Sequence, residues 1–251
     1  MTVRATSLGI ALGLLTAGGA TGCADQQEGL IVLNALTTTS MGCVADPNNA
    51  ALAQGRLDIA FGSPYLLLLA IQNQLQPVSG DLSNGGIDNS EMQLRTADVR
   101  LTSDQIPGVI DVLEAQDPAL VDFSVSLAAD SLGGGDVRGI FVEVISRAAS
   151  EALLEQFGVH PELPTGAIPR VNVEVVVHAR RTGNAVGGVG DIEAREYIFP
   201  IDICVGCLLT TSTCENGVPT QPFAGFIGGE CGNAQNLLYA PAGCGDPAEA
   251  M

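Results

Sequence analysis

The sequence contains no lysine and no tryptophan, and basic side chains of any kind are scarce. Its 251 residues carry 28 acidic side chains against 10 arginines, which gives a formal net charge of −18. Binding to the phosphates of nucleic acids requires clustered basic side chains, and so does electrostatic adhesion to anionic lipid. The composition therefore argues against a nucleic-acid partner and against adhesion to a membrane through surface charge.

The N-terminal apolar stretch is too short to be a permanent membrane span. It extends from Leu8 to about Ala17 and leads into several glycines, whereas a spanning helix needs about 20 apolar residues. The stretch follows Arg4 and the α-amine and precedes a run of small residues. Residues 1–22 therefore have the three parts of an export signal peptide.

The small residues end in Ala20-Thr21-Gly22-Cys23, which resembles the lipobox of bacterial lipoproteins. In that family Gly or Ala directly precedes the cysteine, and Leu usually stands where this chain has Ala20. The resemblance implies cleavage before Cys23, a diacylglycerol on its sulfur and an acylated (for example palmitoylated) N-terminus, which together anchor a protein stably in a membrane. The alternative is an ordinary signal peptide cleaved elsewhere, with Cys23 as a free or bridged thiol.

The residue after Cys23 bears on localisation. Enteric lipoproteins that stay in the inner membrane carry Asp at this position, whereas this chain has Ala24. The resemblance therefore implies a cell-envelope protein of the outer membrane rather than the inner membrane.

The chain has seven cysteines, and an odd number would leave one thiol unpaired in an exported protein. If Cys23 carries lipid, six cysteines remain, enough for three disulfides in an oxidising compartment. Six cysteines allow fifteen pairings, and we expect one bridge to join Cys43 to the C-terminal region. The disulfide candidates are Cys43, Cys204, Cys207, Cys214, Cys231 and Cys244.

Alternation of apolar and polar residues dominates the middle of the chain and is typical of strands with one buried face. Tyr65–Leu75 is apolar on both faces at its start, which indicates a more central strand. The alternation changes phase within 92–101 and within 192–203, as a β-bulge would produce. The clearest alternating segments are 57–61, 121–130 and 171–178.

Six or seven such strands predict a mainly β fold, an immunoglobulin-like or fibronectin-like β-sandwich. One amphipathic helix is expected over 141–157, packed on an end or edge of the sandwich, with Gly158 at its C-cap. A weaker helical pattern covers Gly108–Gln116.

The sequence therefore divides into four parts with different composition. The last part is rich in Cys, Gly and Pro and has little periodicity, so disulfides would have to hold it together. The parts are a signal peptide (1–22), a lipidated cysteine and tether (23–50), a β-sandwich domain (51–203) and a Cys-rich C-terminal region (204–251).

Cys204 and Cys207 form a CxxC motif, the only candidate for reactive chemistry. Redox proteins place such a motif at a helix N-terminus, where the helix dipole lowers the thiol pKa, but the residues after Cys207 have no helical pattern. A four-thiolate zinc site that added Cys214 and Cys231 would not have the spacing of two paired CxxC knuckles. Structural disulfides are the leading interpretation, and an envelope thiol-redox or zinc-dependent protein is the alternative.

The two histidines, His160 and His178, belong to no recognisable catalytic motif. Neither HExxH nor a GxSxG elbow is present. His178 falls on the polar side of its strand, where a solvated side chain is expected, and His160 lies in a loop. We therefore nominate no catalytic residue, no metal ligand and no cofactor.

Two loops superficially suggest ligands. The glycines of 183–190 precede another strand pattern instead of the helix of a dinucleotide fingerprint, so they predict a hairpin loop. Residues 79–91 gather oxygen-bearing side chains, which calcium prefers, but their spacing fails the EF-hand template. A solvated turn is the main interpretation there, and a calcium-dependent adhesion module is a further alternative.

These observations favour a lipid-anchored cell-envelope protein with a non-catalytic structural or binding role. Its expected partners are the membrane, through the lipid anchor, and an unidentified envelope protein or ligand.

Overall fold

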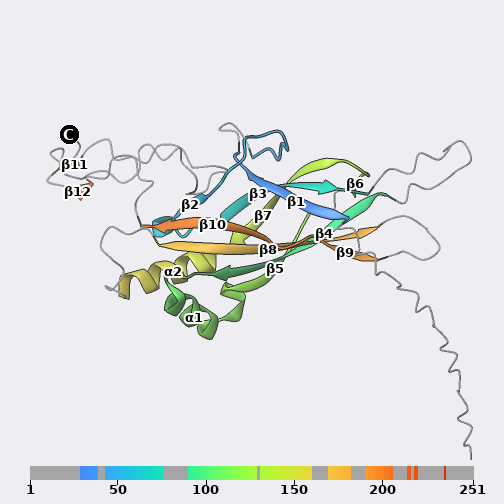
Figure 1. The fold of residues 1–251 in the computed structure, drawn as a ribbon. Coiled ribbons are helices and arrows are strands. Elements are labelled where there is room, and N and C mark those ends of the chain that lie inside the picture. Colours follow the sequence, from blue (N-terminus) through green and yellow to red (C-terminus); the bar gives the residue numbers. More distant parts are fainter. Residues whose placement is uncertain are drawn as a thin grey trace, which may run out of the picture.

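The computed structural model describes residues 29–38, 43–75, 90–128, 131–159, 169–181 and 190–205, together with 214–215, 218–219 and 235. Within these residues the protein is mainly β, with two curled sheets, a separate two-stranded ladder and two α-helices (Figure 1). This confirms the mainly β fold class that the alternating segments predict.

The smaller sheet has three antiparallel strands in the order β1-β3-β7. The central position of β3 confirms the expectation for Tyr65–Leu75, because Leu67 and Leu69 on one face and Leu68 and Ala70 on the other are all buried. The strands are β1 (Leu30–Leu36), β3 (Tyr65–Asn73) and β7 (Val137–Ile145).

The larger sheet has seven strands in the order β2-β10-β8-β4-β5, with β6 beside β4 and β9 beside β8. Its neighbours are antiparallel except β2 and β10, which are parallel. The strands are β2 (Gly55–Asp58), β4 (Met92–Thr102), β5 (Asp122–Ser126), β6 (Ser131–Leu132), β8 (Arg170–Arg181), β9 (Asp191–Glu193) and β10 (Tyr197–Cys204).

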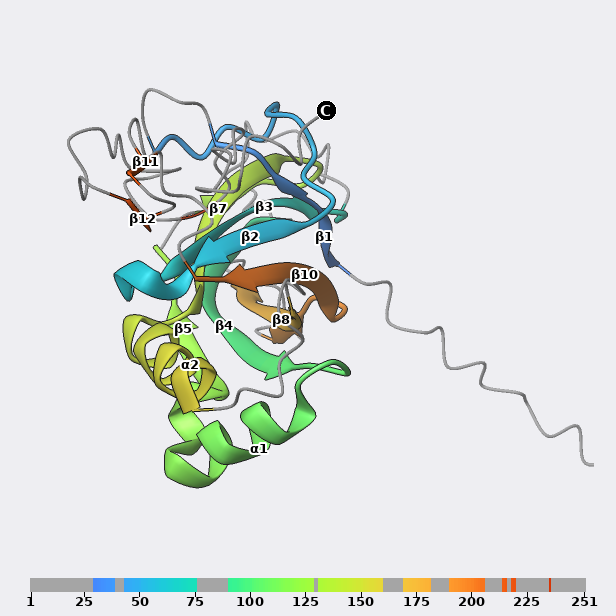
Figure 2. The same ribbon diagram turned by 90° about the vertical axis from the view of Figure 1, so that its left-hand side faces the viewer.

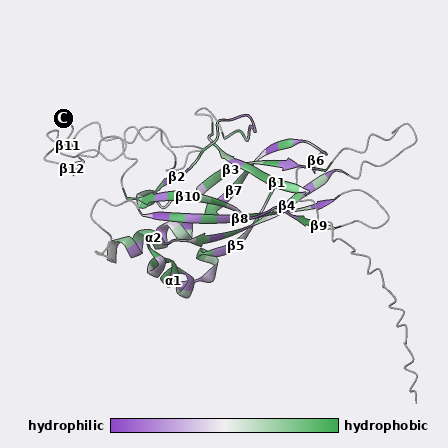
Figure 3. Ribbon diagram, viewed as in Figure 1, coloured by the Kyte–Doolittle hydropathy of each residue, from purple (hydrophilic) through white to green (hydrophobic). Residues whose placement is uncertain are grey.

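The two sheets share one hydrophobic core. The alternating valines of β8, from Val171 to Val177, are fully buried in it, as predicted, and so are the inward residues of β3 and β7. Tyr65 of β3 and Phe199 of β10 meet with ring centroids 6.5 Å apart, in a tilted arrangement that joins the two sheets. The alternation of apolar and polar residues along the strands is visible in Figure 3.

Two polar contacts also tie the sheets together. The backbone N–H of Ala35 in β1 donates to the Tyr197 hydroxyl of β10 at 2.8 Å, and burial raises the pKa of that phenol. Gln235 forms a backbone bridge with Leu57 of β2. Its side-chain amide accepts from the N–H of Leu66 in β3 at 2.7 Å and donates to the carbonyl of the same residue at 2.8 Å.

The helices lie together at one end of the sheets, where the strands β4 and β10 end (Figures 1 and 2). Their apolar sides, including Leu113 and Leu153, close that end of the core. No helix in the described ranges is long and apolar enough to cross a bilayer. The helical elements are η1 (Ile59–Phe61), α1 (Pro107–Gln116), η3 (Pro118–Leu120) and α2 (Arg147–Val159), and a separate small ladder pairs β11 (Cys214–Glu215) with β12 (Val218–Pro219).

The prediction of a helix over 141–157 is wrong for its first part, because the strand β7 continues to Ile145. Along β7, Val142 and Val144 are fully buried at strand spacing, and β-branched residues favour strands. The helix begins only after Ser146, whose Oγ accepts from the N–H of Ala149 at 3.1 Å. It also continues through Gly158, where a C-cap was expected.

Two other expectations need correction. Part of the segment assigned as a tether, 23–50, is the strand β1, and its first residue, Leu30, is wholly buried. The alternation over 57–61 is a strand only as far as Asp58, whose carboxylate accepts from the N–H of Ala60 at 3.1 Å and starts η1. Both corrections arise where local hydrogen bonds or sheet pairing outweigh the local sequence pattern.

Both predicted phase changes occur. In β4 the pairing with β8 shifts between Leu94 and Thr96, which confirms the bulge. The second segment forms two strands, β9 and β10, on the same side of β8. Between the pairs Glu193–His178 and Tyr197–Val175, the three residues 194–196 on one side oppose the two residues 176–177 on the other, so one extra residue is accommodated there.

Candidate functional site

A row of polar side chains crosses four neighbouring strands on the outer face of the seven-stranded sheet. In the centre, Asp98 Oδ2 of β4 lies 2.8 Å from Nε2 of His178 in β8. On one side, Ser124 of β5 donates its hydroxyl proton to Asp98 Oδ1 at 2.5 Å. On the other, His178 Nδ1 lies 3.6 Å from Glu193 Oε1 of β9.

The strand register explains why these four side chains meet. Asp98 stands directly opposite Ser124 in the β4–β5 ladder. Thr96, two positions earlier on the same face, stands opposite His178, which is opposite Glu193 in turn. Diagonal neighbours on one sheet face are within reach of long side chains, so His178 bridges the carboxylates of Asp98 and Glu193.

The carboxylate in the middle is held in its charged form. The hydrogen bond from Ser124 is the main cause that lowers the pKa of Asp98. Burial raises it in opposition, and the hydrogen bond and charge of His178 lower it again. Since the Asp98 side chain is 50% exposed, solvent screens the pair, and its contribution to stability is small.

The order of the groups decides what the row can do chemically. In a nucleophilic triad the imidazole takes the proton of the serine hydroxyl, and the carboxylate orients the imidazole. Here Ser124 donates to Asp98, and both ring nitrogens of His178 face carboxylates. This arrangement links strands and does not activate a hydroxyl. Within the described ranges no three His, Cys, Asp or Glu side chains gather closely enough to hold a metal ion.

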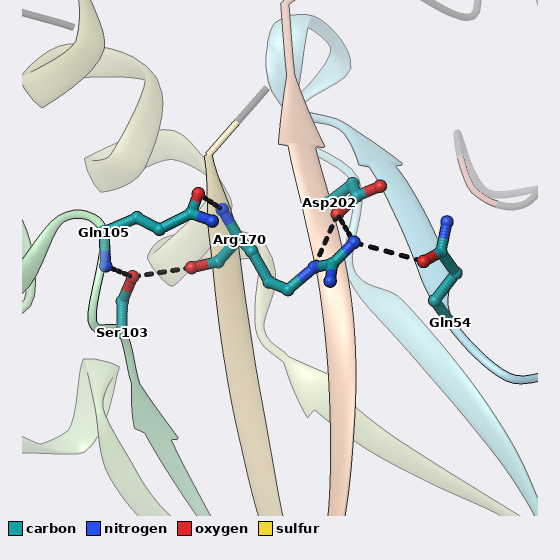
Figure 4. A network of polar contacts seen from close by, with 5 residues as sticks. All are labelled: Gln54, Ser103, Gln105, Arg170 and Asp202. Atoms are coloured by element: carbon teal, nitrogen blue, oxygen red, sulfur yellow. Dashed lines mark hydrogen bonds and ion pairs between the residues drawn. The ribbon is translucent and has the colours of Figure 1, made fainter. Parts of the chain in front are cut away.

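A second polar network fastens the end of the same sheet (Figure 4). The guanidinium of Arg170 contacts Asp202 Oδ1 through Nε at 2.9 Å and through Nη2 at 2.8 Å, and Nη2 also donates to Gln54 at 3.1 Å. The backbone of Arg170 is held as well, because its N–H donates to the Gln105 side chain at 2.9 Å and its carbonyl accepts from Ser103 Oγ at 2.6 Å. Strands β2, β4, β8 and β10 are thereby joined near the helices.

The hydroxyl of Ser103 is fully engaged in this network. It donates to Arg170 and accepts from the N–H groups of Gln105 and Ile106 at 3.2 and 3.1 Å. These bonds shape the turn into α1, whose own N-cap residue makes no side-chain cap. Ser103 is therefore a structural residue whose proton and lone pairs are committed to the backbone.

A cavity of about 200 Å³ lies beside Ser103, between the end of β4 and α1. Buried apolar residues and side chains of both charge signs line it. The lining residues are Arg100, Leu101, Thr102, Ser103, Pro107, Ile110, Asp111, Glu114 and Val121. Sequence reasoning did not anticipate this cavity, because no motif marks it and it depends on how α1 packs against β4.

The cysteines named from the sequence are only partly described. Cys43 and Cys204 are each disulfide-bonded. For each bond the described residues include only one of the two cysteines, so the pairing of the cysteines stays a prediction. Cys204 is buried, and its sulfur lies 3.5 Å from the carbonyl oxygen of Leu57. Of Cys214 only the backbone is described, in β11. Outside the described residues lie Cys23, Cys207, Cys231 and Cys244.

The remaining candidates also fall largely outside the described residues. These include His160, the glycines of 183–189 and the oxygen-bearing residues of 79–89, so the hairpin, solvated-turn and calcium interpretations stay untested. His178 lies on the outer face of its strand, as predicted, but its side chain is only 23% exposed because two carboxylates flank it.

No protein-family model, no curated protein and no solved structure matches this chain.

Proposed function

We propose that this chain is an exported lipoprotein of the bacterial cell envelope, anchored in the outer membrane through Cys23, with a non-catalytic structural or binding role. The signal pattern of residues 1–22 and the lipobox at Ala20–Cys23 support the export and the anchor. The disulfide-bonded state of Cys43 and Cys204 supports an oxidising compartment.

The observation that carries the proposal is the position of β1. Leu30, the first residue of β1, is wholly buried, and only residues 24–29 separate it from Cys23. Six residues span about 20 Å when fully extended. A lipid on Cys23 would therefore hold the folded domain against the membrane surface and not at the end of a long tether.

The two polar networks favour a structural or binding role over catalysis. In the row around His178, the hydroxyl of Ser124 donates its proton to the carboxylate of Asp98. The hydroxyl of Ser103 already donates to one backbone group and accepts from another. A nucleophile activated by an adjacent base requires a different order of groups.

We also propose that the fold is an immunoglobulin-like or fibronectin-like sandwich with additions. Two mostly antiparallel sheets around one core support this assignment. The parallel pairing of β2 with β10 and the two helices would be additions to that plan. An experimental structure of the whole chain, with every strand connection traced, tests it.

The anchor is tested by comparing the wild-type chain with Cys23→Ala in the organism that makes it. We expect wild-type protein in the membrane fraction, with an intact mass that includes diacylglycerol and an acyl chain. Cys23→Ala should appear in the soluble fraction without that added mass. Ala20→Leu, which restores the usual lipobox residue, is the matched control and should remain lipidated. Membrane association of Cys23→Ala at the wild-type level would overturn the anchor.

The thiol-redox or zinc alternative is tested by alkylating the purified native chain without reduction. Fully bridged cysteines should take up no label, whereas a redox or zinc protein would expose two or more reactive thiols. Labelling of Cys204 or Cys207 in the native state would replace the structural interpretation with the alternative.

A further inference from the structure

A short segment of the chain covers the side of the three-stranded sheet that faces away from the shared core. We call this segment, residues 43–50, the strap. In Figures 1 and 2 it lies beyond β1 and β3, on the side away from β10. Ala45 of the strap packs there on a second apolar cluster, in which Leu68 and Ala70 of β3 are buried. The other members of this cluster are Leu36, Val137 and Phe141.

The strap touches β7 at a position that admits only glycine. A Cβ atom at Gly139 would lie 2.6 Å from the carbonyl oxygen of Ala45 and 2.7 Å from its carbonyl carbon. Both are backbone atoms, so the strap itself would have to move to make room for a side chain. Gly139 stands opposite Ala70 in the register of β3 and β7. Two small residues on neighbouring strands therefore leave the space that the strap occupies.

Hydrogen bonds to the rest of the fold hold the strap only at its last residue. There the N–H and the hydroxyl of Thr37 both donate to the carbonyl of Ala50, at 2.8 and 3.2 Å. The bonds of residues 44–49 stay within the strap. For example, the N–H and the side-chain amide of Asn48 both donate to Asp46 Oδ1 at 2.9 Å. Within the described part of the chain, none of these bonds reaches β3 or β7.

The other end of the strap is held covalently, by the disulfide of Cys43. Cys43 is exposed, whereas Cys204, which belongs to a different disulfide, is buried. Exposed disulfides are the more easily reduced ones. Asn49 Nδ2 is buried with no hydrogen-bond partner among the described residues, which opposes the closed position of the strap. The disulfide thus holds down a segment that gains no hydrogen bond from the strands it covers.

We infer that the Cys43 disulfide is a redox latch that keeps the strap closed over β3 and β7. When a dithiol reduces the bond, the strap leaves the sheet and uncovers Leu68, Ala70 and Phe141. In this step the S–S bond breaks, two electrons and two protons pass from the dithiol to the two sulfurs, and the dithiol becomes a cyclic disulfide. The inference goes beyond the proposed function and relies on the envelope location only for the oxidised resting state.

The first test is a titration of the purified, folded full chain with dithiothreitol. Alkylation with peptide mass mapping reports which cysteines are reduced, and the dye ANS reports exposed apolar surface. We expect Cys43 to be labelled before Cys204, with a several-fold rise in dye fluorescence that follows the labelling of Cys43. Hydrogen exchange of the Val173 and Val175 amides in the core strand β8 should not change at that stage.

Three results would overturn the latch. The dye fluorescence could stay low while Cys43 is labelled, or it could rise only when Cys204 is labelled. Exchange in β8 could also become faster together with dye binding, which would mean that the whole domain opens and not the strap alone.

Two variants should open the strap without a reductant. Gly139→Val places a side chain against the Ala45 carbonyl, in a strand that suits valine, and Cys43→Ser removes the latch. Both should bind the dye as strongly as reduced wild type. Gly108→Ala is the control, because a Cβ atom there meets nothing within 4 Å, and it should bind as weakly as oxidised wild type. Weak dye binding by Cys43→Ser would show that the disulfide does not hold the strap.

The outcome is separable from that of the proposed function. Dye binding and thiol labelling are measured on purified protein, so they are read out whether or not Cys23 carries lipid. A lipidated chain whose dye binding ignores the reduction of Cys43 overturns this inference alone. An unlipidated chain whose strap opens on reduction overturns the anchor alone.

Discussion

At the residue scale, Asp98 is the side chain whose charge links three strands. Its pKa is lowered from the usual value of 3.8, chiefly by the hydrogen bond from Ser124. A carboxyl group with a lowered pKa in the folded state adds stability above its unfolded pKa and loses it as the pH falls through the folded value. Asp98→Asn should therefore be less stable than wild type at pH 6, by at most about 1 kcal/mol because the group is half exposed.

The difference between wild type and Asp98→Asn should shrink as the pH falls below about 4. Urea unfolding at pH 6 and at pH 3 measures it. Ser124→Ala is the matched variant, because it removes the largest cause of the shift while the carboxyl remains. A difference that stays constant across this pH range would show that the ionised form of Asp98 is not preferentially stabilised.

The partners of His178 also show what the sequence can and cannot predict for single residues. Alternation along β8 correctly predicts which face His178 occupies. Asp98 lies 80 residues away in sequence, and its even-numbered position faces outward only because the bulge between Leu94 and Thr96 reverses the phase of β4. The sequence shows the phase change, but it does not show which strand pairs with β4. The contact between Asp98 and His178 therefore could not be predicted.

At the element scale, Ser146 marks the point where the chain changes from β7 to α2. Its Oγ accepts from the N–H of Ala149, as an N-cap side chain does. Ser146→Ala should lower the free energy of unfolding by about 1 kcal/mol, whereas Ser146→Asp, which keeps an acceptor, should lower it by less. Urea unfolding of both variants decides this. Equal losses in the two variants would mean that the serine acts through packing instead of capping.

The error over 141–157 has its cause at this same boundary. Phe141, Val144 and Ile145 fit a helical period with the residues that follow, while Val142 and Val144 fit a strand period with those before. Pairing with β3 resolves the ambiguity in favour of a strand, and that pairing joins segments far apart in sequence. By contrast, the valines of β8 fit only one period, and their strand was predicted correctly.

At the scale of the whole molecule, the sequence indicates strands and a buried core but not their grouping into sheets. The segment 30–36 shows the limit: its apolar residues could belong to a tether, and only its pairing with β3 identifies it as a core strand. The contact of Gln235 with β2 and β3 could not be predicted from the sequence either, because a single polar residue belongs to no periodic pattern.

Gln235 joins the two sheets and should be important for global stability. It is wholly buried, bridges Leu57 of β2 through its backbone and satisfies both backbone groups of Leu66 in β3 through its side chain. Gln235→Ala leaves these two partly buried backbone groups without partners, and an unsatisfied group costs about 1–3 kcal/mol when it is fully buried. We expect a loss of about 1–2 kcal/mol in the free energy of unfolding, measured by urea denaturation of the full chain.

The exposed Gln54 provides the control for this substitution. Its side chain accepts one hydrogen bond from Arg170 at the surface, so Gln54→Ala should cost less than about 0.5 kcal/mol. Gln235→Glu is informative as well, because a carboxylate accepts from the Leu66 N–H but cannot donate to the Leu66 carbonyl. If Gln235→Ala were as stable as Gln54→Ala, the C-terminal segment would contribute nothing to holding the sheets together, and the core would be closed by the strands and helices alone.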